Sequence, residues 1–168
     1  WRKNIKTSGI LIDFETKELV NTGLAMPHSP RVYDKELFFL QSATGSLCKA
    51  NLANGTFDEI YKTTSFVRGM SIYKDYAFIG LSKLRASSTS FAELVNENFA
   101  NHAGVVVINI KTGEFIGQIE YLNSVEEIFD VCVLEHCNNP NILSLEREES
   151  YLAMETPFGS WWAVNKDV

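Results

Sequence analysis

The sequence is short of cysteine, of positive charge and of long apolar runs, and each shortage excludes a class of protein. Its 3 cysteines are an odd count without the spacing of a disulfide framework, which indicates reduced thiols and a cytoplasmic setting. The 15 Lys and Arg residues against 21 Asp and Glu give a net charge of −6, which argues against nucleic acid and anionic membranes as partners. The longest apolar run, Gly104 to Ile108, is far too short to cross a bilayer.

Familiar catalytic and cofactor motifs are also missing. Cys132, His136 and Cys137 lack the paired spacing of a zinc site, and Ser29 beside His28 is not framed by the glycines of a nucleophile elbow. There is no phosphate-binding loop and no dinucleotide fingerprint. The sequence therefore indicates no cofactor.

The start of the chain has the character of the middle of a domain. No charged-then-apolar leader follows Trp1, the first Met is Met26, and the opening residues already read as strand. We therefore expect a fragment of a longer chain, or a module that a missing N-terminal half or a second copy completes.

What the chain does contain is a repeat of strand, turn and strand. Three segments carry it: LIDFETKEL (Leu11 to Leu19), KANLANGTF (Lys49 to Phe57) and VINIKTGEF (Val107 to Phe115). Asp13, Asn51 and Asn109 align, 38 and then 58 residues apart. A period of about 40 residues built from strands and turns is typical of β-propeller blades, and the longer second interval predicts an insertion.

The repeat predicts an all-β, β-propeller-like fold of about three four-stranded antiparallel blades, part of a larger ring of the six-bladed type. The blades are expected near residues 9–24, 28–62, 66–121 and 128–150, with an insertion at 85–104 and a C-terminal tail at 151–168. The insertion could form a short helix near Phe91 to Asn98 and act as a lid. An ordinary β-sandwich with a coincidental repeat is the alternative that turn spacing alone leaves open. A partial ring has exposed sheet edges, so pairing with other chains is expected.

Three strings resemble a known family: GLAMPHSPRVYD, FVRGMSIYKDYAFIGLSKLR and GVVVINIKTGEFIGQIEYLNSVEEIFDVCVLEHCNNPNIL. The family is one of bacterial conserved hypothetical proteins that carry a domain of unknown function with β-propeller character. Its recurrent motifs are matched at Pro27 to Arg31, Arg68-Gly69, Tyr76 to Arg85, Thr112 to Glu114 and Glu127 to Val131. The resemblance covers residues 10 to 143. It implies a propeller, of which this chain is the C-terminal half, and it names no reaction.

Superposing the repeats places three polar residues at equivalent positions. When Tyr33 is matched to Tyr73, His28 falls on Arg68, and the same count in the third blade reaches Asp130 within about one residue. Such positions meet at one mouth of a propeller channel. The wider candidate set for ligand binding is His28, Ser29, Arg31, Arg68, Ser82, Lys83, Arg85, Glu127 and Asp130.

Two functions fit this set. Arg68 can hold a carboxylate or phosphate with a fork of donors, which favours a module that binds a small polar or anionic molecule or a peptide. The alternative is a metal-assisted hydrolase or lyase in which His28 or Asp130 acts as base, and it requires a divalent cation. A purely structural role is also open, in which Arg68 and Asp130 form an ion pair that ties blades together.

Overall fold

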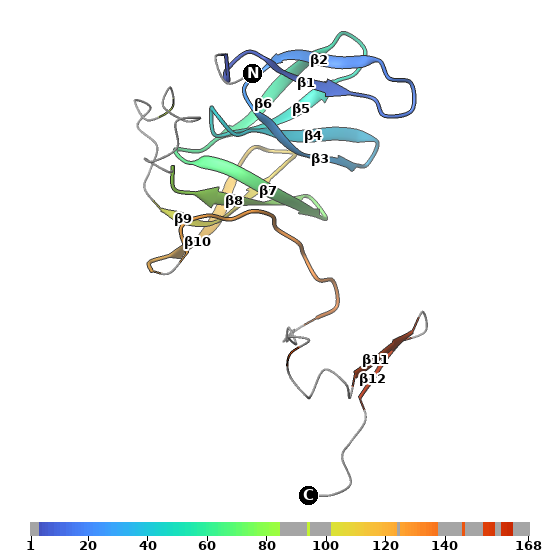
Figure 1. The fold of residues 1–168 in the computed structure, drawn as a ribbon, viewed down its shortest axis with the longest axis vertical. Helices are drawn as coiled ribbons and strands as arrows, with labels where there is room; N and C mark the ends of the chain where they lie inside the picture. Colours follow the sequence, from blue (N-terminus) through green and yellow to red (C-terminus); the bar gives the residue numbers. More distant parts are fainter. Residues whose placement is uncertain are drawn as a thin grey trace, which may run out of the picture. The chain divides into compact units, whose positions relative to one another are not determined.

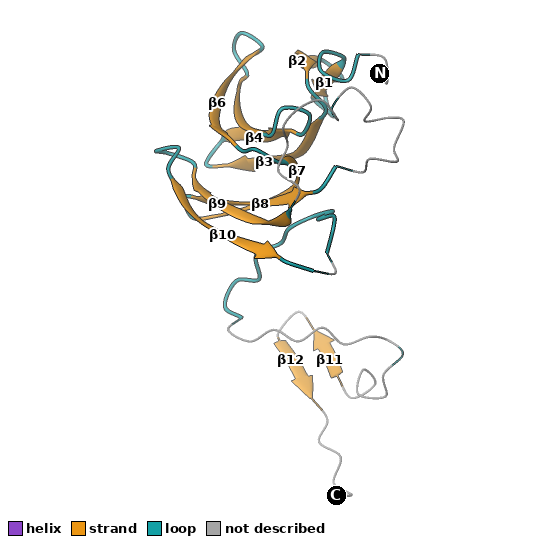
Figure 2. Ribbon diagram, turned by 90° about the vertical axis from the view of Figure 1, so that its left-hand side faces the viewer, coloured by secondary structure: helices purple, strands orange, loops and turns teal. Residues whose placement is uncertain are grey.

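The computed structural model describes residues 4–84, 94, 102–123, 125–137, 146, 153–156 and 159–162, the last two segments through their backbone. The chain forms two compact units, Trp1–Val133 and Leu134–Val168. All regular structure in the described part is β-strand, which confirms the all-β prediction (Figure 2). No helix long and apolar enough to cross a membrane occurs among these residues.

The first unit contains three antiparallel sheets whose strands follow one another in chain order (Figure 1). The first sheet has two strands, β1 (Gly9–Ile12) and β2 (Leu19–Leu24). The second has four: β3 (Pro27–Tyr33), β4 (Glu36–Gln41), β5 (Ser46–Asn51) and β6 (Thr56–Lys62). The third also has four: β7 (Phe66–Tyr73), β8 (Tyr76–Ser82), β9 (Ala103–Asn109) and β10 (Phe115–Tyr121). This arrangement is compatible with successive propeller blades, and no sheet closes into a barrel.

The aligned residues Asp13, Asn51 and Asn109 cap the same kind of turn in all three sheets. The side-chain oxygen of Asp13 accepts from the backbone N–H of Glu15 and Thr16, and Asn109 accepts from Lys111 and Thr112 in the same way. Asn51 accepts from Ala53. The residue four positions later, Lys17, Gly55 or Gly113, has a positive φ and donates its N–H to the carbonyl of the aligned residue. The repeated turn is therefore built by a side-chain cap followed by a left-handed residue.

A second repeated feature is a bulge near the start of the first strand of each four-stranded sheet. The register of β3 with β4 shifts between His28 and Arg31, and that of β7 with β8 shifts between Val67 and Met70. Inside these bulges Ser29 has φ 51° and Gly69 has φ 76°. Since His28 is matched to Arg68 in the repeat, Ser29 is matched to Gly69. The two matched residues share a positive φ inside a bulge.

The main core lies between the two four-stranded sheets. Phe38, Leu40 and Leu47 from the second sheet pack with buried residues of the third, among them Met70 and Ile79. A smaller cluster between the first two sheets contains Leu24, Phe39, Cys48 and Ala50, with Leu11, Leu37 and Phe57 at its border. Apolar residues are buried on both faces of the second sheet, one set against the third sheet and the other against the first. The second sheet therefore lies between the other two.

The long interval in the repeat falls between β8 and β9, which pair directly with each other. The expected short helix in this insertion lies outside the described residues, apart from Leu94, which is fully buried with Ile5, Ala25 and Phe66.

Residues 125–133 differ from the expectation that a third blade begins with a strand at Ile128. They pair with no strand and instead run along β7 in an extended segment. Of the rest of the expected third blade, to residue 150, the structure describes residues 134–137 and 146. In the second unit the described strands are β11 (Ala153–Thr156) and β12 (Gly159–Trp162), which form an antiparallel hairpin.

Candidate functional site

The extended segment 126–133 is fixed to the third sheet by hydroxyl groups. The buried Ser82 Oγ accepts from Ile128 N–H at 2.9 Å and donates to Ile128 C=O at 3.2 Å. The backbone N–H of Lys83 donates to Glu126 C=O at 2.9 Å, and Val133 N–H donates to Ser71 Oγ at 3.2 Å. Ser82 and the Lys83 backbone, both predicted as site residues, thus hold the segment in place.

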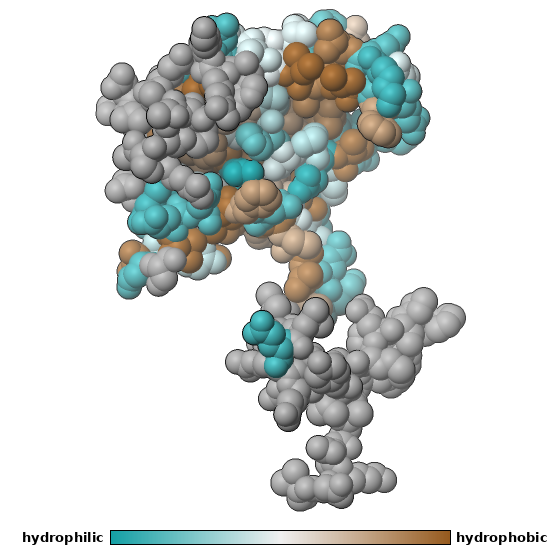
Figure 3. Space-filling view, viewed as in Figure 1, coloured by the Kyte–Doolittle hydropathy of each residue, from teal (hydrophilic) through white to brown (hydrophobic). Residues whose placement is uncertain are grey.

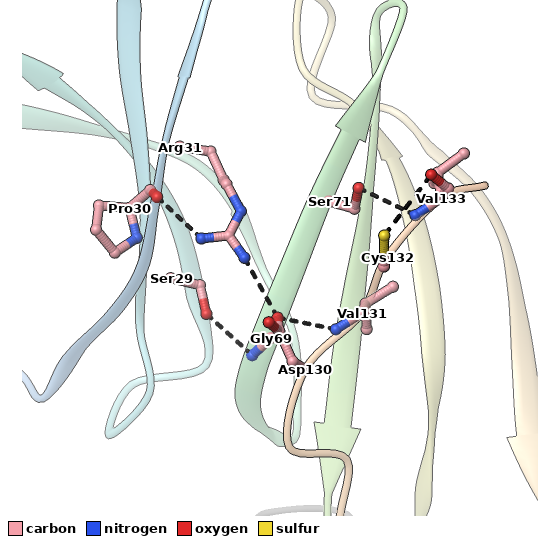
Figure 4. Close-up of polar contacts among 9 residues, drawn as sticks. All are labelled: Ser29, Pro30, Arg31, Gly69, Ser71, Asp130, Val131, Cys132 and Val133. Carbon is pink, nitrogen blue, oxygen red and sulfur yellow. Dashed lines mark hydrogen bonds and ion pairs between the residues drawn. The ribbon is translucent and has the colours of Figure 1, made fainter. Parts of the chain in front are cut away.

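The segment passes over Gly69 closely enough to exclude any side chain there. A Cβ at Gly69 would lie 2.5 Å from Asp130 Cα and 2.9 Å from Val131 N. On its other side Gly69 donates its N–H to Ser29 Oγ at 3.1 Å, which joins the bulges of β3 and β7 (Figure 4). We call this line of contact the seam and define it by Ser29, Arg31, Arg68, Gly69, Glu127, Phe129 and Asp130.

Arg31 and Asp130 form one ion pair of the seam. Arg31 Nη2 lies 3.3 Å from Asp130 Oδ1, and Arg31 Nη1 donates to the carbonyl of Pro30 at 3.0 Å (Figure 4). Asp130 Oδ1 also accepts from Val131 N–H at 2.9 Å. The two side chains are 38% and 60% exposed, so the pair lies in contact with solvent.

Arg68 forms the second ion pair, and its partner is Glu127. Arg68 Nη1 lies 3.7 Å from Glu127 Oε1, and the guanidinium lies 4.0 Å from the centroid of the Phe129 ring. The mutual Arg68–Asp130 pair considered as the structural alternative is not formed. Asp130 pairs instead with Arg31 of β3, in the neighbouring sheet, and Arg68 pairs with Glu127.

His28 is not joined to this seam by any contact among the described residues. Its Nδ1 lies 3.0 Å from Met26 C=O and 2.8 Å from Ser42 Oγ. These two contacts hold the imidazole at the start of β3. His28 lines a separate cavity of about 300 Å³, together with Ile5, Ser8, Gly9, Met26 and Pro27. The equivalence of His28 and Arg68 in the repeat therefore does not bring their side chains together.

The last predicted site residue, Arg85, lies outside the described residues.

The three thiols are free: Cys132 and Cys137 are exposed, and Cys48 is buried. Burial raises the pKa of the Cys48 thiol from 9.0 to about 11, so it stays protonated. Within the described ranges, no group of three or more His, Cys, Asp or Glu side chains is placed to hold a metal ion.

Three side chains whose hydrogen bonds or ring contacts are described above were not among the predicted set: Phe129, Ser42 and Ser71. Phe129 was near the aligned position in the third repeat, and its 71% exposure in a segment of apolar residues marks it as unusual. Ser71 lies two residues after Gly69 and faces the same segment, which period-2 alternation along β7 makes readable from the sequence.

Comparison with known proteins places this unit in a family. The family model of a domain of unknown function (DUF4915) matches residues 1–143. The chain belongs to this family. The DUF4915 match includes every residue of the seam and all three turns of the repeat. A comparison with curated proteins gave no match. Among solved structures, the chain is similar to the computationally designed Ika4 protein at 12% identity, with a TM-score of 0.48 over 95% of this chain and 82% of that one. A similarity of this size supports no inference about fold or function.

Proposed function

We propose that this chain is part of a β-propeller binding module, and that the seam binds a small anionic ligand or a peptide carboxylate. The observation that carries the proposal is the pair of guanidinium groups, Arg31 and Arg68, which come from two adjacent inner strands and are both partly exposed. Arginine binds carboxylate and phosphate through two parallel N–H donors, so two neighbouring arginines favour this ligand class.

Both arginines have donors to spare. Arg31 uses one terminal nitrogen on Pro30 C=O and the other on Asp130. Arg68 approaches Glu127 at 3.7 Å, which is an ion pair but too long for a hydrogen bond, and no hydrogen bond of its guanidinium is found in the described part of the chain. A guanidinium carries five donors, so the contacts found here leave donors on both side chains for a ligand.

The carboxylates of the seam do not prevent such binding. An exposed ion pair such as Arg31–Asp130 contributes about 0–1 kcal/mol, so a ligand that offers a bidentate anion can replace Asp130 at small cost. The exposed ring of Phe129, over which Arg68 lies, adds an apolar surface beside the cations. A ligand with both an anionic group and an apolar part would use both.

The test uses ¹⁵N-labelled protein, in which the side-chain Nε–H signals of Arg31 and Arg68 are followed during titration with inorganic phosphate and with acetyl-trialanine. We expect both signals to shift. Arg68→Ala should weaken binding about ten- to a hundredfold, because a charge-assisted hydrogen bond contributes about 1.5–3 kcal/mol. The matched control is Lys111→Ala, which removes a cation paired with Asp75 at 2.9 Å in a turn away from the seam. Equal weakening by both variants would show general charge attraction and would contradict the proposal.

The wider setting belongs to the same proposal. The ring would be of the six-bladed type and bacterial, with this chain as its C-terminal half, and its setting would be cytoplasmic, which the free thiols favour. The metal-assisted hydrolase or lyase gains no support from the geometry, since His28 and Asp130 have separate surroundings.

A further inference from the structure

Part of one face of the second sheet, along β3, is uncovered, although the equivalent part of the third sheet is buried. In the repeat, Pro30 and Val32 of β3 correspond to Met70 and Ile72 of β7. Met70 is fully buried and Ile72 is half-buried, since the hairpin β3–β4 packs over them with Tyr33 and Phe38. Pro30 is exposed, and Val32 is 75% exposed. The same strand position is therefore apolar in both sheets, but it is covered in only one.

The strand edge beside this face is also open. The turns at Asp13, Asn51 and Asn109 make β1 the equivalent of β5 and β9. β5 pairs with β4 and β9 pairs with β8, whereas β1 pairs with β2 alone among the described strands. The repeat thus contains two strands in the second and third sheets that have no counterpart in the first.

A groove lies where those two strands would be. Its volume is about 790 Å³, and its walls include Leu11 and Ile12 of β1 and Pro30, Val32 and Leu37 of the second sheet. Exposed apolar side chains surround it, and Figure 3 shows such side chains gathered over β1 and β2. Ile12, Leu19 and Leu52 are 53%, 61% and 60% exposed. A patch of this kind on a protein surface marks a site of association.

We propose that this groove binds a partner polypeptide presenting a two-stranded antiparallel β-hairpin with one apolar face. The second strand of the hairpin pairs with the open edge of β1, and its apolar side chains cover Pro30 and Val32. Strand addition at an open edge supplies backbone hydrogen bonds, and the alternate side chains supply selectivity. The inference is independent of the ligand proposed for the seam.

The hairpin is identified by what fills the equivalent place elsewhere in the chain. The hairpin β3–β4 pairs with β5 through β4 and covers Met70 and Ile72 of the next sheet. A small ligand would meet the apolar face but leave the edge of β1 unpaired. A single added strand would pair with β1 but would leave Val32 in solvent.

The probe is a fluorescein-labelled peptide of residues 27–41, PHSPRVYDKELFFLQ. This peptide is the hairpin β3–β4, which covers Met70 and Ile72 of the third sheet. Binding to the full chain is measured by fluorescence anisotropy. We expect the peptide to bind wild-type protein and to bind Val32→Lys at least about tenfold more weakly, since the lysine would be buried under the hairpin. Ile119→Lys is the matched control, because Ile119 is 61% exposed on the outer strand β10. It should bind as wild type does.

Two further measurements separate the occupants. A peptide with Phe38→Asp and Leu40→Asp loses its apolar face and should not bind. Hydrogen exchange should show that the amides of β1 become protected only when the peptide is present. Absence of peptide binding, or equal binding by Val32→Lys and wild type, would overturn the proposal. A dimer that Val32→Lys converts to monomer, with no peptide binding, would identify a second copy as the occupant and would equally overturn it.

Discussion

Replacing Gly69 by alanine tests whether the segment 126–133 rests on β7. Gly69 has φ 76°, and an added Cβ would lie 2.5 Å from Asp130 Cα and 2.8 Å from Asp130 C. An alanine at positive φ costs about 1–2 kcal/mol, and forcing a methyl group into a filled space costs about 1–3 kcal/mol more. We expect Gly69→Ala to lower the free energy of unfolding by about 2–5 kcal/mol.

Three other glycines separate the two causes. Gly23 has φ 72° with no atom within 4 Å of an added Cβ, so Gly23→Ala measures the backbone cost alone. Gly80 has no positive φ, but its added Cβ would meet the Arg68 carbonyl and lie 2.5 Å from Ile128 Cγ2, so Gly80→Ala measures crowding alone. Gly117 has neither feature, and its variant should stay within about 0.5 kcal/mol of wild type.

Urea unfolding followed by far-ultraviolet circular dichroism is the suitable assay, because the 3 tryptophans lie at positions 1, 161 and 162, outside the strands of the first unit. The midpoint and slope give the free energy of each variant. If Gly69→Ala is no more destabilising than Gly23→Ala, the segment does not rest on β7, and the description of the seam is wrong.

Further predictions concern the buried thiol, the seam and the turns. Because unfolding lets Cys48 ionise near 9.0 whereas the folded thiol ionises at about 11, the free energy of unfolding should fall as the pH rises from 9 to 11, and urea titrations of Cys48→Ala should lack this component. Asp130→Asn should change the free energy of unfolding by less than about 1 kcal/mol, since its ion pair is exposed. Ser71→Ala should cost about 1–2 kcal/mol in the same assay, since it leaves Val133 N–H without its acceptor. A smaller cost for Ser71→Ala than for Asp130→Asn would count against the attachment of the segment 126–133 to β7. Asn109→Ala removes a turn cap and should cost about 1 kcal/mol, measured by urea unfolding.

The turns and sheets were readable from the sequence because their determinants are local. Asp13, Asn51 and Asn109 act on residues two to three positions away, so a short string carries the whole turn. Alternating apolar residues then fix which face of each strand is buried. The sheet order follows because each strand pairs with its neighbour in the chain.

The contacts of the seam could not be obtained in this way. The bulges at Ser29 and Gly69 insert a residue into β3 and β7, and a one-residue shift re-aims the side chains that follow. Side-chain length then decides the partners. Arg68 reaches the segment beyond its own strand, whereas the shorter His28 is held by Ser42 and Met26 at the start of β3. Counting positions along the repeat captures neither effect.

The chain-order sheets also determine how the first unit folds. Each pairing joins strands adjacent along the chain, so each sheet can grow from local hairpins, the fast elementary step of β-structure. The bond from Gly69 to Ser29 instead spans 40 residues, and the pair of Arg31 and Asp130 spans 99. Closing loops of this length costs conformational entropy before the contact is made, so we expect these contacts to form late in folding. We therefore expect the seam to close after the sheets have formed, and substitutions in it should speed unfolding while leaving the rate of refolding nearly unchanged.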